Sequence, residues 1–254
     1  MKHPDKGHLI SIVLKPHYGA DTPKQASHFG ASPAFISPMK VEGFVGDTNL
    51  GGSCNAFELT INPHTSGTHT ETQWHFGGKK IPPIEAVKKS AYVAVLITLD
   101  PASDISGESY PVPTSKGDLF LTKDMLSVKL ETYLKTVSPE ALVIRTLPNP
   151  PEKKTTSWNQ DVVSPYLTME CASYIKNLGI KHFVADFPSV DKNEDGGKLA
   201  VHRILLDGRD HTVTEMAYID NAVCDGIYDL SIEVPPICLD AVPSALYLRT
   251  PAKP

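Results

Sequence analysis

Residues 62–75 constrain this chain more than any other segment. They read Asn-Pro-His-Thr-Ser-Gly-Thr-His-Thr-Glu-Thr-Gln-Trp-His, with three histidines, one glutamate and no apolar run in which to bury them. Imidazole and carboxylate groups are ligands of Zn2+ and similar ions, and histidine is the side chain best suited to proton transfer near neutral pH. A hydrolytic metal centre is therefore the first hypothesis for this segment.

The composition is that of an ordinary globular protein. Of its 254 residues, 41% are hydrophobic and 21% are charged, which is enough for a sizeable core and compatible with one domain over residues 1–254. The net charge of −5 gives no electrostatic reason to expect nucleic acid or an anionic membrane as a partner. No apolar stretch has the length of a transmembrane helix, and residues 9–14 are too short for a signal-peptide core. We therefore expect a cytoplasmic protein.

The cysteines suggest no shared chemistry. Cys54, Cys171, Cys224 and Cys238 are scattered without Cys-x-x-Cys spacing, so isolated buried thiols are expected rather than a disulfide framework or a zinc ribbon. Cys54 follows Gly-Gly-Ser, but no neighbouring histidine could activate it as a nucleophile. A buried thiol in a strand is the preferred interpretation of Cys54.

The apolar pattern alternates between strands and helices. Strands are predicted at residues 9–14, 54–61, 91–99, 141–144 and 182–186, and helices at residues 82–87, 122–134 and 168–178. Residues 22–38 are predicted to form an irregular arm and residues 101–117 a loop, because both are rich in proline and serine. No internal repeat is found, and this order of elements indicates an α/β or α+β domain.

Spacing decides which side chains of residues 62–75 can meet. His69 and Glu71 are two residues apart, so in extended backbone both point to the same side and could bind one ion. Pro63 and Gly67 make a continuous strand improbable before His69, and a turn there could bring His64 or Thr65 back toward the same point. His75 could act as a general base near a bound water, or simply pack beside Trp74.

A second group of polar residues lies far along the chain. His202 shares helical spacing with Leu199 and Leu205, so a core histidine is the plain alternative to a metal ligand. Glu215 lies in a β-prone apolar run, where a carboxylate is costly unless it is paired or bound to metal. Asp186 and Asp191 are expected to hold turns through bonds to the backbone rather than to bind metal.

Taken together, these motifs resemble those of a known family. Residues 66–75 are similar to the His-x-Gly-Thr-His-x-Asp-x-Pro-x-His signature of the cyclase-like metal-dependent hydrolases, which include bacterial kynurenine formamidase (arylformamidase) and isatin hydrolase. Residues 186–191, Asp-Phe-Pro-Ser-Val-Asp, resemble the family's later Asp-x-Pro-Ser-Val-Asp element. The segments around His202 and Glu215 resemble its distal ligands, and the likeness runs from about residue 8 to residue 250.

The resemblance implies a fold, a reaction and a set of roles. The fold would be a mixed, partly barrel-like sheet flanked by helices, in a homodimer or homotetramer whose chains jointly wall the site. The function would be metal-dependent hydrolysis of a carbon–nitrogen amide bond, as in the arylformamidase step of tryptophan catabolism or in the opening of a cyclic amide. One or two ions of Zn2+ or Mn2+ would activate water toward a carbonyl carbon. The implied metal ligands are His64, His69, Glu71, His202 and Glu215, and the implied acid/base is His75.

The chain departs from the family pattern at three positions. The family's first histidine corresponds to Thr65 here, and His64 is displaced from it by one residue. Glu71 stands where the family has aspartate, and Gln73 stands where it has proline. A longer carboxylate and a displaced histidine could restore one site together, or they could mark the loss of one ion.

Two further hypotheses remain open from the sequence. A non-catalytic relative that binds a metal or a small molecule would explain the departures at Thr65 and Gln73, whereas a scaffold protein has little support because nothing is repetitive. The substrate is not revealed. Trp74 and Phe44 are candidate contacts for an apolar or aromatic substrate group, although either could belong to the core.

Overall fold

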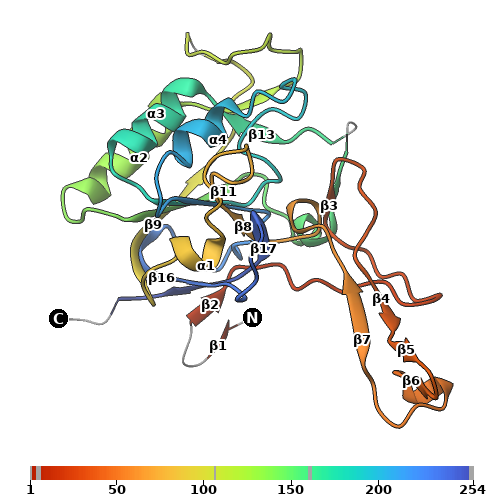
Figure 1. Ribbon diagram of the computed structural model, residues 1–254. Helices are drawn as coiled ribbons and strands as arrows, with labels where there is room; N and C mark the ends of the chain where they lie inside the picture. Colours follow the sequence, from red (N-terminus) through yellow and green to blue (C-terminus); the bar gives the residue numbers. More distant parts are fainter. Residues whose placement is uncertain (1, 4–6, 106, 160–161, 252–254) are drawn as a thin grey trace.

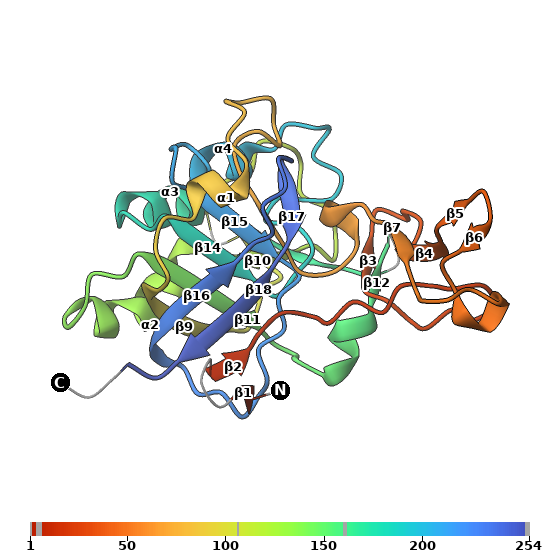
Figure 2. The ribbon, with the colours of Figure 1, turned by 60° about the horizontal axis from the view of Figure 1, so that its bottom comes forward.

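A curled, mixed sheet of ten strands forms the centre of the fold (Figures 1 and 2). The structure, a computed structural model, describes residues 2–3, 7–105, 107–159 and 162–251. The strand order is β1-β2-β18-β16-β9-β11-β14-β15-β8-β17. Segments far apart in the sequence therefore become neighbours, and the sheet closes into a half-barrel.

The middle of the sheet consists of four parallel strands. They are β9 (Tyr92–Leu99), β11 (Ala141–Thr146), β14 (His182–Ala185) and β15 (Thr212–Glu215). Continuous apolar runs predicted the first three, because a parallel strand is buried on both faces. These predictions are confirmed to within two residues at each end.

Antiparallel strands flank this parallel centre on both sides. Beyond β15 lie β8 (His69–Glu71) and β17 (Ala241–Pro243), and beyond β9 lie β16 (Gly226–Glu233), β18 (Ala245–Arg249), β2 (Gly7–Leu9) and β1 (Lys2–His3). The strand predicted over residues 9–14 is wrong beyond Leu9. Beyond Leu9 the chain makes isolated backbone hydrogen bonds to its neighbours, such as the one from Ile10 N–H to Leu246 O at 2.9 Å.

In the part of the chain that the structure describes, four helices accompany the sheet. The three longest, α2 (Lys123–Leu134), α3 (Met169–Asn177) and α4 (Ala200–Leu205), cover one of its faces (Figure 1). The fourth, α1 (Pro83–Ala86), is a single turn. Thr122 and Thr168 cap α2 and α3 by accepting bonds from the backbone N–H three residues on. Gly179 follows α3 with a φ of 78°, the left-handed conformation that favours glycine after a helix. The helix predictions are confirmed.

Alternate side chains of β9 enter two different cores. Val95, Ile97 and Leu99 pack against side chains of the helices, such as Leu130 of α2 and Ile175 of α3. Ala94 and Leu96 face the opposite side, where the curled sheet packs against its own flanking strands. Full burial of a leucine or isoleucine side chain stabilises a fold by about 1.5–3 kcal/mol, so these two layers hold the sheet in its curled form.

An arm that projects from the sheet contains residues 35–60 (Figure 2). In it β4 (Phe35–Pro38) pairs with β7 (Phe57–Thr60), and β5 (Lys40–Val41) pairs with β6 (Phe44–Val45). The remaining elements are short: β3 (Ser27–His28), β10 (Leu119–Leu121), β12 (Ser157–Trp158), β13 (Pro165–Leu167) and the 3-10 turns η1 (Thr48–Leu50), η2 (Pro63–Thr65) and η3 (Pro151–Thr155).

The cysteines are all free thiols, as predicted, but their expected burial is wrong for three of them. Cys171 is buried on α3, whereas Cys54, Cys224 and Cys238 are exposed. Cys54 lies in the arm before β7 rather than inside a strand, because this ribbon has no second layer to cover it. Among the described residues, no helix combines the length and the apolar character that crossing a bilayer requires.

Candidate metal centre

Pairing of β8 with β15 creates the first part of the cluster. The two strands are antiparallel, with His69 opposite Glu215 and Glu71 opposite Val213. Directly opposed residues point to the same face, so His69, Glu71 and Glu215 all turn toward the helix-covered side. There His69 Nε2 lies 3.5 Å from Glu215 Oε2. The prediction that His69 and Glu71, two residues apart in a strand, point to the same side is confirmed.

Helix α4 brings His202 to this point from above the sheet. His202 Nε2 lies 2.9 Å from Glu71 Oε1 and 3.3 Å from Glu215 Oε1. On the other side of the ring, Nδ1 is 2.7 Å from Asp191 Oδ2, which also accepts the backbone N–H of His202. Asp191 thus caps the start of α4 and fixes the ring, and the expectation that it holds a turn is confirmed.

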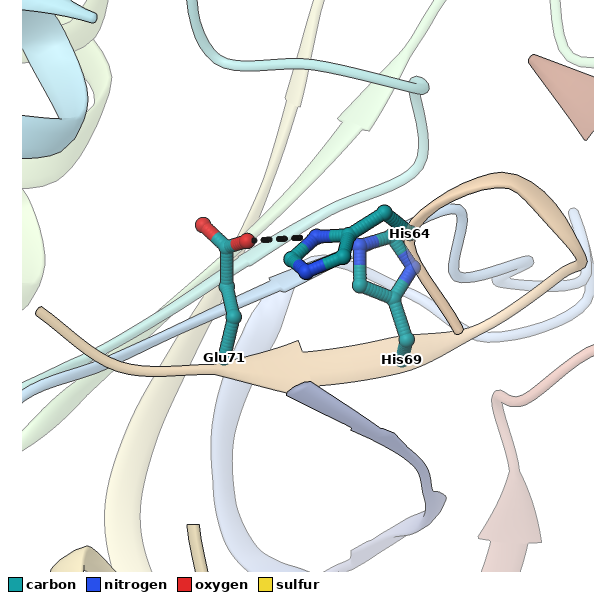
Figure 3. A group of neighbouring side chains, drawn as sticks. All are labelled: His64, His69 and Glu71. Carbon is teal, nitrogen blue, oxygen red and sulfur yellow. Dashed lines mark ion pairs between the residues drawn. The ribbon is translucent and has the colours of Figure 1, made fainter. Parts of the chain in front are cut away.

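A turn returns His64 to the same carboxylate. The side chain of Asn62 caps η2 by accepting the backbone N–H of His64 at 3.2 Å, and the turn places His64 Nδ1 3.1 Å from Glu71 Oε2 (Figure 3). The rings of His64 and His69 lie 5.3 Å apart between centroids. The sequence-based prediction of a turn near Pro63 that swings His64 back is confirmed. Thr65, the last residue of η2, is buried.

His75 and Asp240 form the solvent-facing rim of the cluster. His75 stacks on His64 at 4.2 Å between ring centroids, and its Nε2 lies 4.0 Å from Glu71 Oε2. Asp240 Oδ2 is 2.8 Å from His64 Nε2 and 3.6 Å from His75 Nδ1. The side chains of His64, His75 and Asp240 are 20%, 25% and 36% exposed, whereas that of Glu71 is fully buried, so water and ligands reach the cluster from this side.

Four buried atoms of the cluster make no well-directed hydrogen bond among the described residues: His69 Nε2, His202 Nε2 and both carboxylate oxygens of Glu71. They face one another as close ion pairs, with His202 Nε2 2.9 Å from Glu71 Oε1 and His64 Nδ1 3.1 Å from Glu71 Oε2. Buried polar atoms that converge without well-directed hydrogen bonds fit a site in which a further group binds between them. The Nδ1 of His69 meets the carbonyl of Gly67 at 3.0 Å and acts as its donor, which leaves Nε2 with a lone pair directed at Glu215.

This donor set fits a divalent cation. His64, His69 and Glu71 offer ligand atoms that all lie within 4.8 Å of one another, and so do Glu71, His75 and His202. Nitrogen and carboxylate oxygen donors of this kind suit Zn2+ and Mn2+. Without a cation, protons on His64 and His202 balance the facing carboxylates, and a cation would take the place of these protons.

Charges within the cluster shift its pKa values strongly. Burial lowers the pKa of His202, but Glu71, Asp191 and Glu215 outweigh burial and hold that pKa well above its usual value. Burial raises the pKa of Glu71, yet the adjacent His202 and His64 keep it well below the ordinary range. Burial also lowers the pKa of His75, and its imidazole neighbours lower it further. The cluster thus favours ionised carboxylates and a neutral His75.

Strained backbone flanks the cluster on both sides. Leu199, just before α4, has a φ of 47°, and Met216, just after Glu215, has a φ of 55°. Non-glycine residues adopt such left-handed conformations at a cost of about 1–3 kcal/mol, and this strain concentrates at functional sites. The Asp195 side chain braces the first of them by accepting the Leu199 N–H at 2.6 Å.

Most of the candidate residues from the sequence converge here, and one does not. His64, His69, Glu71, His75, His202 and Glu215 meet at one point. Phe44 lies on β6 in the projecting arm, away from β8 (Figure 1), and its contact with a substrate stays a prediction. The arm pairs with itself and carries Phe44 away. Trp74 is half-buried next to His75, with Lys80 Nζ 5.8 Å from its ring centroid, and its substrate contact stays a prediction.

Sequence reasoning missed Asp240. It lies 176 residues after His64 and reaches it only because β17 pairs with β8, with Ala241 opposite Glu71. Nothing in the local pattern around Asp240 signals this pairing, since β17 has only three residues. Asp186, in contrast, is a brace as expected: it accepts hydrogen bonds from the backbone N–H and the hydroxyl of Thr146 and from Lys153 Nζ.

Comparison with known proteins gives one family and one fold. Residues 10–192 match the family model described as "Putative cyclase". A kynurenine formamidase of Bacillus cereus is 30% identical over 192 residues, which cover 75% of this chain and 77% of the relative. His202, Glu215 and Asp240 lie beyond the residues that the family model matches, and the sheet joins them to the matched part.

Two solved structures share the fold over almost the whole chain. Isatin hydrolase A from Labrenzia aggregata superposes with a TM-score of 0.61 at 15% identity, covering 96% of this chain and 93% of that one. A protein described as a predicted metal-dependent hydrolase from Bacillus stearothermophilus superposes with a TM-score of 0.56 at 14% identity, covering 95% and 96%. The curled sheet with few helices is therefore the architecture of these proteins.

Proposed function

The chain belongs to the "Putative cyclase" family, and from that premise we propose that it is a metal-dependent hydrolase that cleaves a carbon–nitrogen amide bond. The observation that carries this proposal is the convergence of three imidazoles, those of His64, His69 and His202, with the carboxylates of Glu71 and Glu215 at one largely buried point. His69, Glu71, His202 and Glu215 would hold the cation, with His64 completing the set from the rim.

The side chains divide the work between binding and proton transfer. When bound, a divalent cation supplies a Lewis acid that lowers the pKa of an adjacent water and polarises a carbonyl oxygen. His75 lies at the open side of the cluster, and burial lowers its pKa so that its imidazole is neutral and can take a proton. The water that His75 deprotonates would attack the carbonyl carbon. As the carbon–nitrogen bond breaks, His75 would give this proton to the leaving nitrogen.

The relatives indicate which amide to test first. The named relatives at about 30% identity are kynurenine formamidases, and the isatin hydrolases share the fold. Both names indicate hydrolysis of an amide, in which the bond between the carbonyl carbon and the nitrogen of an aromatic compound is cleaved. Trp74, which is half-buried and precedes His75 in the chain, is the candidate contact for the aromatic part of such a substrate. An N-formyl aromatic amine is the first choice of substrate, and a cyclic aryl amide is the second.

A single variant tests the role of His75. His75→Ala should lower turnover by roughly 10²–10⁴-fold, the usual contribution of a positioned acid/base, while the bound metal remains. Formate release from formylkynurenine and metal content by mass spectrometry are measured on the same samples. Retained turnover would defeat the assignment of His75. A wild-type protein that binds neither Zn2+ nor Mn2+ would defeat the hydrolase proposal itself and favour a non-catalytic relative.

A further inference from the structure

Two histidines flank Glu71 in matching arrangements. His202 has Nδ1 on Asp191 at 2.7 Å and Nε2 2.9 Å from Glu71 Oε1. His64 has Nε2 on Asp240 at 2.8 Å and Nδ1 3.1 Å from Glu71 Oε2. Each ring therefore has one nitrogen on an outer carboxylate and the other on one oxygen of the same buried glutamate.

The outer carboxylate decides what the inner nitrogen offers. A carboxylate accepts an N–H, so a neutral imidazole bonded to it must present the lone pair of its other nitrogen on the opposite side. Carboxylate–histidine–metal arrangements use this effect to orient a ligand and to raise its basicity. Asp240 directs the Nδ1 lone pair of His64 toward Glu71 as Asp191 directs the Nε2 lone pair of His202. A cation is the group that both lone pairs and Glu71 can share.

The displaced position of His64 makes this arrangement necessary. His64 comes one residue before the position of the family's first histidine, and its ring enters the cluster through Nδ1, the nitrogen nearer to the backbone. His69 and His202 enter through Nε2. Glu71 is one methylene longer than aspartate and reaches toward His64. The remaining nitrogen, Nε2, then points outward and needs a carboxylate at the rim.

The sheet fixes Asp240 at the place where that carboxylate is needed. Strand β17 begins directly after it and pairs with β8, and the backbone N–H of Thr72 donates to the Asp240 carbonyl at 3.2 Å. The backbone of Asp240 is therefore tied to the residue next to Glu71. An incidental surface ion pair would have no such anchoring on the strand that carries the metal ligands.

We propose that Asp240 is a positioning residue of the metal centre: by holding His64 Nε2, it turns Nδ1 into a ligand atom and compensates for the one-residue displacement of this histidine. The inference rests on the metal site of the proposed function. It adds a residue that acts through His64 rather than by touching the cation or the substrate.

The test is a double-mutant cycle read out by metal binding. Metal-free wild type, Asp240→Asn, His64→Gln and the double variant are titrated with Co2+, and the affinity and visible absorption spectrum of each are recorded. Asp240→Asn should weaken binding by about 10–100-fold and change the spectrum, as expected for loss of a carboxylate behind a ligating histidine. In the His64→Gln background, Asp240→Asn should have no further effect, because its partner is already gone.

Two controls separate this role from a purely structural one. Asp220→Asn changes an exposed loop aspartate outside the cluster and should leave both affinity and spectrum unchanged. Asp240→Glu keeps the carboxylate and should restore part of the affinity. Urea unfolding of the metal-free forms should show that Asp240→Asn still folds and loses no more stability than His64→Gln, since both changes remove the same ion pair.

Each alternative outcome contradicts a defined statement. If Asp240→Asn binds Co2+ within twofold of wild type, or if its effect persists undiminished in the His64→Gln background, the inference is overturned and the proposed function stands. If wild type itself binds no Co2+ or Zn2+, the proposed function fails and the inference fails with it.

Discussion

The two halves of the metal centre are built in different ways. The inner half, His69, Glu71, His202 and Glu215, lies on paired strands and on a capped helix and is almost fully buried. The rim half, His64, His75 and Asp240, lies on a 3-10 turn, a loop and the residue before a strand, and its side chains are between 20% and 36% exposed. The inner half fixes ligand positions through strand register, whereas the rim half fixes them through hydrogen bonds between side chains.

This difference has a thermodynamic consequence. Strand register is held by the whole sheet, so no single inner side chain is needed to keep the others in place. The rim depends on a few local contacts, such as Asn62 with the His64 backbone and Asp240 with the His64 ring. Exposed pairs of this kind contribute little to stability. The rim should therefore be easy to disturb without unfolding the protein.

Glu71 joins the two halves, and its loss should have the largest effect. Glu71→Gln removes the charge to which both His64 and His202 turn, so metal binding and turnover should fall by at least about 10³-fold. Metal content after dialysis and formate release measure the two effects. Glu58→Gln, on the exposed strand β7, is the matched control and should behave as wild type. Normal metal content in Glu71→Gln would show that the halves do not share this ligand.

Without metal, the rim should make stability depend on pH. Burial lowers the pKa of His64, but hydrogen bonds to Asp240 and Glu71 outweigh burial and raise the pKa to about 10. Since this value exceeds the unfolded pKa of about 6.5, the stabilisation is complete below about pH 6.5 and is lost as the pH rises toward 10. The loss should amount to a few kcal/mol at most in urea unfolding.

His64→Gln should flatten this pH dependence, and bound Zn2+ should remove it, because the cation takes the place of the proton. Urea unfolding of the metal-free and Zn2+-loaded forms between pH 6.5 and 9.5 compares the two. A metal-free protein whose stability rises over this range would contradict the described pairing of His64.

Asp191 tests whether the orientation of a ligand in the inner half matters, because it holds the His202 ring and does not itself belong to the proposed metal ligands. Asp191 accepts four hydrogen bonds, from Tyr110 Oη, from the backbone N–H groups of Val201 and His202, and from His202 Nδ1. Asp191→Asn should weaken metal binding by about 10–100-fold and lower the free energy of unfolding by about 1–3 kcal/mol.

Asp195→Asn serves as the control for Asp191→Asn. Asp195 is also buried and bonds to the backbone of Gly197 and Leu199, but it does not contact His202. This variant should lose stability while keeping its metal affinity. Equal losses of metal affinity in the two variants would show that Asp191 acts only by holding the loop.

The smallest effect is expected at the turn that carries His64. Asn62→Ala removes the cap of η2, which should cost about 1 kcal/mol of stability. Because the turn positions His64, metal affinity should fall by only a few-fold, which calorimetric titration with Zn2+ can resolve. A loss as large as that of Asp191→Asn would mean that the rim is as rigid as the inner half.

The sequence predicts the inner half better than the rim. Residues 91–99 are a strongly apolar run that favours a buried strand, and residues 182–186 read as a strand that ends on a carboxylate. The period of two in a strand places His69 and Glu71 together. Proline and glycine around His64 signal the turn but not its partner. Asp240 escapes prediction because its position depends on a three-residue strand that pairs far from its own sequence neighbours. Nor does the sequence around Phe44 reveal that the arm pairs with itself.

The central claim is that the two distant groups of residues surround one cation. Crystals grown with Zn2+ and measured at the zinc absorption edge would test it most directly through an anomalous difference map. The account predicts a peak in contact with His69, Glu71, His202 and Glu215. A map without a peak at this point, or with zinc bound only elsewhere on the protein, would contradict it.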